Sequence, residues 1–341
     1  MTGAADLEVF LDDTPGETRG VIARGGRYTH FLIHRDEDPP QHRLGARSVG
    51  RVTQVVPGLR GAFVDVGAGP AAFLPLGRND SVAQGERIEV AVVAEPRDGK
   101  GAAVRRLGPG EGAPRLVESG PSIVQTLRRL APDAPILTGP PAIDASLEAE
   151  SEALAETHAF AADGLDLAVQ RTRALVAVDI DHAPAHGRDP AKGRARANAE
   201  GLRQAARLIG LKNWGGLVII DAVGDGRDGE ALSRAVRAAF SEFPQAAFGP
   251  VSRFGLAQLS LPWTRTPVEE VLSLSVRTRA QALVRDLRRR LLTDTATARL
   301  VARCVPEEAT AAGLLVAALG PRAAVVADLS VAPGCGRIQE D

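Results

Sequence analysis

Two short apolar runs in this sequence each end on an aspartate. Residues 175–178 (Leu-Val-Ala-Val) lead to Asp179, and residues 217–220 (Leu-Val-Ile-Ile) lead to Asp221. Such a run is typical of a buried strand whose carboxyl end lies at the ligand crevice of an open α/β sheet. Asp181 comes two positions after the first acid, so the alternation of side chains along a strand returns it to the same side. Three carboxylates in one crevice repel one another unless a divalent cation neutralises them, which predicts a metal site.

These acids also allow a purely structural interpretation. An aspartate at a strand end often caps the following turn, because its side chain accepts a hydrogen bond from the backbone. A zinc site is a further alternative, since His182 and His186 follow Asp181 closely. Pro184 breaks any helix between the histidines, and no cysteine or third histidine lies nearby, so we expect no zinc. Carboxylate oxygens instead favour magnesium, with manganese as the alternative ion.

The overall charge is nearly balanced, but basic residues gather between the two acidic strand ends. The 341-residue chain has a formal net charge of −1, which excludes a protein coated in basic charge. From Arg171 to Lys212 the sequence holds nine Lys or Arg and four Asp or Glu. A local patch of this kind suits a nucleic-acid backbone, although a solvated loop and helix start would have the same composition.

The elements that must position the acids alternate between strands and helices. From residue 166 to residue 261 the pattern predicts strand, strand, basic loop, helix, strand, helix and strand, as in an α/β layer. The first helix, over about 191–209, ends at Gly210 and leaves Asn198 and Glu200 near its exposed or site-facing side. Its apolar residues at helical spacing are Leu202, Ala205, Ala206 and Ile209.

Short strands separated by turn residues precede this layer. Antiparallel strands are expected within residues 7–33, followed by a small β-barrel that ends near residue 107. The barrel strands are predicted over 49–56, 62–66, 71–74 and 87–95. Helices are predicted over 123–130 and 147–158, with prolines between them. Beyond Pro267 we expect a compact α/β tail with a helix over 268–292, a strand over 298–305, a helix over 307–319 and a strand over 323–329.

Several motifs occur in order along the chain. Val-Ala-Val-Asp-Ile-Asp at 176–181 is followed by Asn-Ala-Glu at 198–200, by Leu-Lys-Asn-Trp-Gly-Gly-Leu-Val-Ile-Ile-Asp at 211–221 and by Val-Ser-Arg-Phe-Gly-Leu at 251–256. Upstream lie Gly-Arg-Val-Thr at 50–53, Gly-Ala-Phe-Val-Asp-Val-Gly at 61–67 and Ala-Phe-Leu-Pro-Leu at 72–76. In this order, across roughly residues 6–260, the sequence resembles the ribonuclease E/G family.

The resemblance implies a multidomain protein of α/β and β architecture. Residues 1–45 together with 109–165 would form an RNase H-like subdomain. An S1-type OB-fold barrel for RNA binding, residues 46–108, would be inserted in it. Residues 166–266 would form a DNase I-like catalytic α/β subdomain, and residues 267–341 a small carboxy-terminal α/β domain.

The resemblance also implies a function, that of a metal-dependent endoribonuclease that cleaves single-stranded RNA during RNA processing or decay. Asp179 and Asp221 fall on the two metal-binding aspartates of the family, which would hold magnesium. Asp181 takes the place of the third catalytic residue, an asparagine in the family. The family continues with Ser-Gly-Arg, whereas this chain has His-Ala-Pro at 182–184, so the loop is altered.

A second set of residues matches the RNA-binding positions of the family. Phe63 and Phe73 correspond to its RNA-stacking phenylalanines, Lys100 to their basic partner, and Arg253 lies in the Ser-Arg-Phe-Gly-Leu motif. Stacking on aromatic rings tolerates any base, which suits a single-strand binder. The alternative is that both phenylalanines belong to the barrel core, although the small residues beside them would leave the rings uncovered.

Two features of the family are missing from the corresponding segments. The barrel lacks the insertion that senses a 5′ monophosphate, so we expect no such preference. The Cys-Pro-x-Cys zinc link between protomers is missing between Leu261 and Val268, so we expect a monomer or a weak homo-oligomer. The two cysteines, the start of the sequence and the lack of a long apolar run predict a reduced, cytoplasmic protein that has no membrane partner.

Two other functions stay open at this point. The protein could be a catalytically weak or inactive RNA-binding or ribosome-maturation factor with the same architecture, because the loop after Asp181 has changed. More remotely, the same strand ends could serve a metal-dependent phosphatase or a DNA nuclease. Dependence of RNA cleavage on magnesium separates the enzyme from the binding factor.

Overall fold

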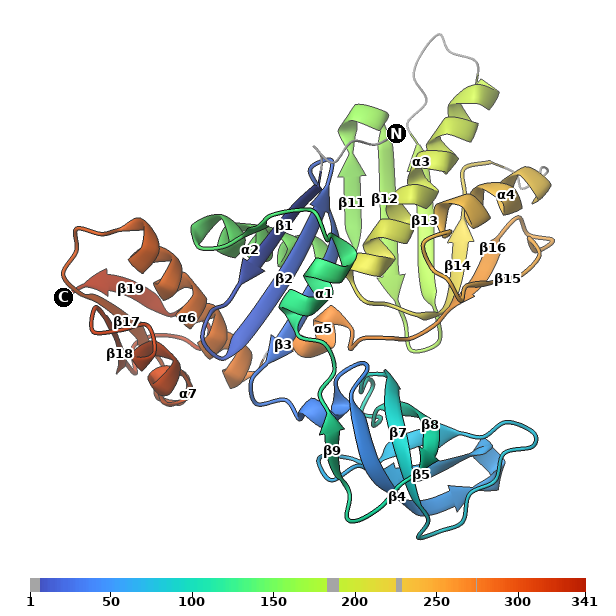
Figure 1. Ribbon diagram of the computed structural model, residues 1–341. Coiled ribbons are helices and arrows are strands. Elements are labelled where there is room, and N and C mark those ends of the chain that lie inside the picture. Colours follow the sequence, from blue (N-terminus) through green and yellow to red (C-terminus); the bar gives the residue numbers. More distant parts are fainter. Residues whose placement is uncertain (1–6, 183–189, 225–228, 274) are drawn as a thin grey trace. The chain divides into compact units, whose positions relative to one another are not determined.

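The computed structural model describes residues 7–182, 190–224, 229–273 and 275–341. These residues form a mixed α/β protein with four β-sheets (Figure 1). They divide into two compact units: one contains the chain up to Glu150 together with Val268–Asp341, and the other contains Ser151–Pro267. No helix in the described parts of the chain is long and apolar enough to cross a membrane.

The first sheet of the larger unit has the strand order β10-β1-β2-β3. Strands β1 (Leu7–Asp12), β2 (Glu17–Arg24) and β3 (Arg27–Arg35) are antiparallel, and β10 (Ile136–Leu137) pairs parallel to β1. Helix α1 (Ile123–Leu130), predicted over the same residues, packs on this sheet and begins with a capping box between Ser122 and Gln125. The core beneath α1 contains Val9, Ile22, Leu32, Ile123 and Leu127.

Helix α2 (Pro140–Leu154) corrects the prediction of a helix over 147–158. Pro140 and Pro141 lie in the first turn of the helix, where a missing N–H breaks no hydrogen bond, so they begin the helix rather than separate it from the preceding one. His158, placed at the helix end by the prediction, lies in strand β11 (Thr157–Phe160).

The second sheet of this unit closes into a five-stranded, OB-like barrel. Its strands are β4 (Arg47–Val56), β5 (Gly61–Asp65), β6 (Ala72–Pro75), β7 (Arg87–Ala94) and β8 (Ala103–Pro109). The order β5-β6-β8-β7-β4 closes because β5 also pairs with β4, so the predicted small barrel is confirmed. Strand β9 (Arg115–Glu118) pairs with β4 outside this circle. Single 3-10 turns are η2 (Pro40–His42), η3 (Pro57–Leu59) and, in the smaller unit, η4 (Ala161–Asp163).

The carboxy-terminal part of the larger unit is a three-stranded sheet with two packed helices. It contains α5 (Val268–Val271), α6 (Val276–Thr293), β17 (Leu300–Cys304), α7 (Pro306–Ala317), β18 (Ala323–Ala327) and β19 (Arg337–Glu340). The single helix expected over 268–292 is wrong, because Ser275 caps a new helix, its Oγ accepting from the backbone N–H of Thr278 at 3.1 Å. Strand β19, which the sequence did not predict, pairs antiparallel to β17.

The smaller unit is a six-stranded sheet with helices on one face. The strands are β11, β12 (Leu165–Arg171), β13 (Val176–His182), β14 (Gly216–Asp221), β16 (Ala257–Leu261) and β15 (Ala247–Phe248), in that spatial order. Helix α3 (Pro190–Leu211) packs on β12 and β13, and α4 (Gly229–Ala239) packs on α3 and β16 (Figure 1). The predicted alternation of strands and helices is confirmed. The predicted apolar face of α3 is buried, and Gly201 lets the helix approach β13, because a Cβ there would lie 2.5 Å from Ile180 Cγ2.

Candidate active site

The two acidic strand ends meet in the central, parallel pair of the six-stranded sheet. Asp179 of β13 and Asp221 of β14 are direct register partners. Paired residues of neighbouring strands point to the same face, so the two carboxylates start from backbones about 4.8 Å apart. Asp181 lies two residues further along β13 and shares this face. The structure therefore brings together the three acids that the sequence singled out.

A fourth acid, which sequence reasoning missed, belongs to the same group. Asp166 of β12 pairs with Asp181 across the antiparallel β12–β13 ladder. The local signal was the alternation of Leu165, Asp166 and Leu167, in which the acid takes the polar position of a half-buried strand. Its partner could not be read from the sequence, because that depends on the register between the two strands.

All four acids lie on the face of the sheet opposite the helices. Val178 and Ile180, which alternate with the acids along β13, are buried beneath α3, whereas Asp179 and Asp181 are exposed. Asp166 and Asp221 are exposed as well. We call these residues, Asp166, Asp179, Asp181 and Asp221, the carboxylate cluster. Its members are open to solvent and to a ligand.

The carboxylate cluster contains uncompensated negative charge. Partial desolvation raises the pKa of Asp179, and the neighbouring charges of Asp181, Asp221 and Asp166 raise it further. No Lys or Arg among the described side chains forms an ion pair with any of the four acids. Their mutual repulsion would be relieved by a cation.

The donor chemistry of the cluster fits a divalent cation. Within the described residues no three His, Cys, Asp or Glu side chains are close enough together to enclose an ion. Carboxylate oxygens are nevertheless the ligands that magnesium prefers, at about 2.0–2.1 Å. Asp179 and Asp221 are the two acids of the cluster that pair directly across the parallel strands, and Asp181 lies on the same strand as Asp179.

Helix α3 fixes the backbone that leaves Asp221. The side chain of Asn198 donates from Nδ2 to the carbonyl of Val223 at 2.9 Å, and its Oδ1 accepts from the N–H of Val223 at 2.8 Å. This pair of hydrogen bonds holds the residue two positions after Asp221. Asn198, which the sequence placed on the exposed or site-facing side of the helix, thus ties α3 to the acidic strand end.

Several basic residues of the predicted patch, within residues 171–212, form hydrogen bonds or ion pairs inside the protein. Lys212 is buried and donates from Nζ to the carbonyls of Ala153 and Ala155, so it cannot meet a nucleic acid. Arg203 pairs with Glu200, and Arg207 pairs with Glu152. Arg194 and Arg196 are exposed near the start of α3. Arg188 and His186 lie outside the described residues, and so does the side chain of Lys192.

Two phenylalanines predicted to contact RNA lie side by side on the barrel. Phe63 of β5 and Phe73 of β6 are register partners, and their rings meet edge to face with centroids 5.6 Å apart. Both are half-exposed and stand outside the barrel core. Gly61 makes room for Phe73, because a Cβ there would lie 2.2 Å from the ring. Lys100 is exposed in the turn before β8, the strand that pairs with Phe73.

Arg253 lies in the turn that leads into β16. Its guanidinium packs over the ring of Phe254, 4.8 Å from the centroid, and both side chains are exposed. Ala257, the first residue of β16, pairs with Ile220, the residue before Asp221. The turn that contains Arg253 is therefore at the same end of the sheet as the carboxylate cluster.

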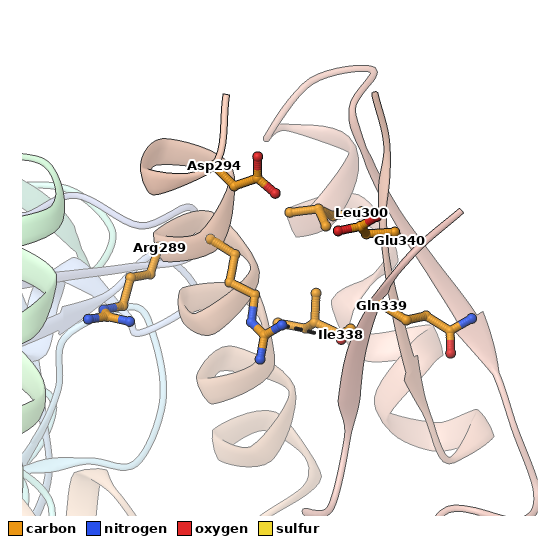
Figure 2. Close-up of a pocket in the computed structure, with 7 residues that line it drawn as sticks. Arg289, Asp294, Leu300, Ile338, Gln339 and Glu340 are labelled. Atoms are coloured by element: carbon orange, nitrogen blue, oxygen red, sulfur yellow. Dashed lines mark hydrogen bonds between the residues drawn. The ribbon is translucent and has the colours of Figure 1, made fainter. Parts of the chain in front are cut away.

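A pocket of about 580 Å³ lies elsewhere, between α6 and β19 of the larger unit. Figure 2 shows Arg289 turned away from Asp294 at its rim; its Nε donates to Asp144. Arg290 also lines the pocket, and its Nη1 donates to the carbonyl of Ile338. Because arginines accompany its acids, this pocket lacks the uncompensated charge of the carboxylate cluster.

The comparison with known proteins concerns the smaller unit above all. Residues 136–262 match the model of the Ribonuclease E/G family. This segment of the chain is of the ribonuclease E/G type. The matched segment runs from β10 to the end of β16, so it contains all four acids of the carboxylate cluster and the turn with Arg253.

Individual curated proteins are similar to the chain over a comparable length. Ribonuclease G of Haemophilus influenzae is 31% identical over 117 residues, which cover 28% of this chain and 23% of the relative. Ribonuclease G of Escherichia coli is 31% identical over 116 residues, again 28% of this chain and 23% of the relative. The chain thus spans about a quarter of the length of these relatives.

Proposed function

We propose that this protein is a metal-dependent endoribonuclease that cleaves single-stranded RNA in RNA processing or decay. One observation carries the proposal: Asp179 and Asp221 are register partners on an open sheet face, with Asp181 beside them and no basic side chain paired to them among the described residues. The segment that holds them is the one that matches the ribonuclease E/G family. A cytoplasmic site of action stays a prediction from the sequence.

The proposed roles of the acids follow from their places on the sheet. Asp179 and Asp221 would hold a magnesium or manganese ion. When bound, this ion supplies acidity to a water molecule and stabilises negative charge on the phosphate. Asp181 is placed to accept a hydrogen bond from the attacking water. Asp166, one strand further away, increases the negative field that attracts the cation.

In this proposal the barrel binds the RNA strand. Phe63 and Phe73 present half-exposed rings on one surface, where bases can stack, and Lys100 adds a positive charge for a phosphate. We assign the barrel to the S1 type, the sheet that contains β1–β3 to an RNase H-like subdomain around it, and the six-stranded sheet to a DNase I-like subdomain. The chain order supports this, because the barrel strands lie between β3 and α1.

The test is cleavage of a labelled, unstructured RNA by the purified chain. We expect internal cuts with magnesium, none in chelator, and RNA binding in both. RNA with a 5′ monophosphate and RNA with a 5′ hydroxyl should be cut at similar rates. Zinc removal should change neither activity nor assembly. Absence of cleavage with magnesium and with manganese would overturn the proposed enzyme.

One observation favours a second function, an RNA-binding or ribosome-maturation factor with little or no turnover. Asp181 stands where the family has asparagine, so the cluster carries one more negative charge than the family pattern, and the following residues also differ. Extra charge can hold the ion in an unproductive position. This factor would bind RNA equally well in magnesium and in chelator and would cut it in neither.

A further inference from the structure

We propose that Phe254 is a base-stacking residue for the RNA strand beside the carboxylate cluster, and that it positions the nucleotide one or two steps from the bond to be cleaved. This inference rests on the proposed function. It adds a contact within the smaller unit, separate from the stacking surface of the barrel.

The exposure of Phe254 is the first support. Its side chain is 74% exposed, and it is the aromatic member of the exposed large hydrophobic residues in the described structure. The chain has only nine phenylalanines, and Phe160 and Phe240 are buried in the same unit. Single exposed apolar residues are common on protein surfaces, so exposure alone decides nothing. The turn that carries the ring, its place near the acids and the neighbouring Arg253 are what indicate a ligand.

The turn beneath Phe254 is held rigid by its own hydrogen bonds. The hydroxyl of Ser252 accepts from the N–H groups of Phe254 and Leu256, at 3.3 and 3.2 Å. The Ser252 N–H donates to the carbonyl of Leu256 at 2.8 Å, and Gly255 supplies the positive φ of +83° that closes the turn. A ring on such a turn loses little conformational entropy when a base stacks on it.

The register of the sheet places this turn beside the acids. Ala257 is opposite Ile220, the residue before Asp221, and Phe254 lies three residues before Ala257 in the chain. Three residues span at most about 10 Å. Stacked bases follow one another at about 3.4 Å. A phosphate at the carboxylate cluster would therefore bring a base one or two steps away within reach of the ring.

The neighbouring Arg253 completes the chemistry of a nucleotide contact. Its guanidinium lies against the ring of Phe254, which leaves the other side of the ring for a base. Arginine can donate to a phosphate oxygen while it remains stacked. Stacking reads the π-face that every base has, so this contact would not select a sequence.

The experiment uses the full chain, with chelator present so that cleavage does not interfere. A short RNA carries the fluorescent base 2-aminopurine at one position, and the position is moved along the strand. We expect one position whose fluorescence is quenched on binding to the wild type. Phe254→Ala should remove that quenching and weaken binding about tenfold, whereas Phe254→Trp should keep both. Leu329→Ala, which truncates a side chain that is 89% exposed, is the control and should change neither.

The outcomes separate this inference from the proposed function. If Phe254→Ala leaves the quenching and the affinity unchanged, the stacking role is wrong, whether or not the wild type cleaves RNA with magnesium. If Phe254→Ala instead changes the oligomeric state at unchanged RNA affinity, the ring belongs to a protein interface and the inference is overturned. Loss of quenching in a chain that never cleaves RNA would support the contact and contradict the enzyme.

Discussion

The two acidic centres of this protein differ in how their charge is neutralised. In the larger unit, Asp12 and Glu17 are completely buried, and Arg285 donates to both, from Nε to Asp12 at 2.6 Å and from Nη2 to Glu17 at 2.9 Å. Arg19 donates to the same oxygen of Glu17 as Arg285, and Arg35 donates to the other oxygen. In the smaller unit, the four acids of the carboxylate cluster face one another without such partners among the described residues. The first centre is closed, and the second is open to a ligand.

The pKa shifts of the two centres run in opposite directions. Burial alone would raise the pKa of Glu17, but the charges of Arg19, Arg285 and Arg35 outweigh it and lower the pKa to about 2. Desolvation and three carboxylate neighbours raise the pKa of Asp179. Burial lowers the pKa of Arg285, which stays charged because it lies between two acids. A carboxylate that the fold has neutralised supports the structure, whereas one left beside other carboxylates remains open to a cation.

The largest expected effect comes from removing a proposed metal ligand. Asp179→Asn or Asp221→Asn should lower the cleavage rate about a thousandfold, equal to roughly 4 kcal/mol of transition-state stabilisation. Stability to urea should stay the same or increase, because one repelling charge is gone. Asp133→Asn, an exposed acid in a loop, makes the same change of charge and should do neither. A ligand variant that retains wild-type cleavage would contradict the shared-ion model.

Removing a residue of the closed centre should instead lower the stability of the fold. Arg285→Met leaves two buried carboxylates without their shared partner, which should destabilise the fold by about 3–5 kcal/mol. Urea unfolding followed by circular dichroism measures this loss. Arg290→Met, on the exposed side of the same helix, is the control and should cost less than about 1 kcal/mol. Equal unfolding midpoints for the two variants would show that the buried network contributes nothing.

How much of each centre could be predicted from the sequence depended on how far apart in the chain its contacting residues lie. The acidic strand ends were predictable because an apolar run and its terminal aspartate are adjacent in the chain. Asp166 was missed because its membership depends on strand register. The closed centre gave no signal, since Arg285 meets Asp12 across 273 positions.

The agreements and differences between the predicted and the observed secondary structure also have local causes. Helix α1, with its capping box, and the barrel, with its turn residues, were predicted because their signals lie within a few residues. Pro140 was interpreted as a helix breaker, but it begins α2 because a helix tolerates proline in its first turn. The break between α5 and α6 follows from the cap at Ser275, which lies in the middle of an otherwise helical pattern.

The pH dependence of stability gives an intermediate effect. Because the folded state lowers the pKa of Glu17 from 4.5 to about 2, Glu17 contributes its full stabilisation above about pH 4.5. That contribution, about 3 kcal/mol, is lost as the pH falls toward 2. Urea unfolding at a series of pH values should show a steeper decline over this window in the wild type than in Glu17→Gln. Parallel curves would mean that Glu17 has an ordinary pKa in the folded state.

The smallest effects concern the two acids beside the proposed ligands, and they sharpen the comparison within the open centre. Asp166 and Asp181 are register partners, so each adds one exposed negative charge at a similar place. Asp166→Asn should raise the magnesium concentration needed for half-maximal cleavage by about two- to fivefold, the range of an exposed charge pair, and added salt should reduce the difference. Asp181→Asn restores the residue that the family carries and should keep the maximal rate within about threefold. A complete loss of cleavage in Asp181→Asn would instead make Asp181 an essential group on a par with Asp179, and the cluster would then be a site of three required acids rather than two ligands in a negative field.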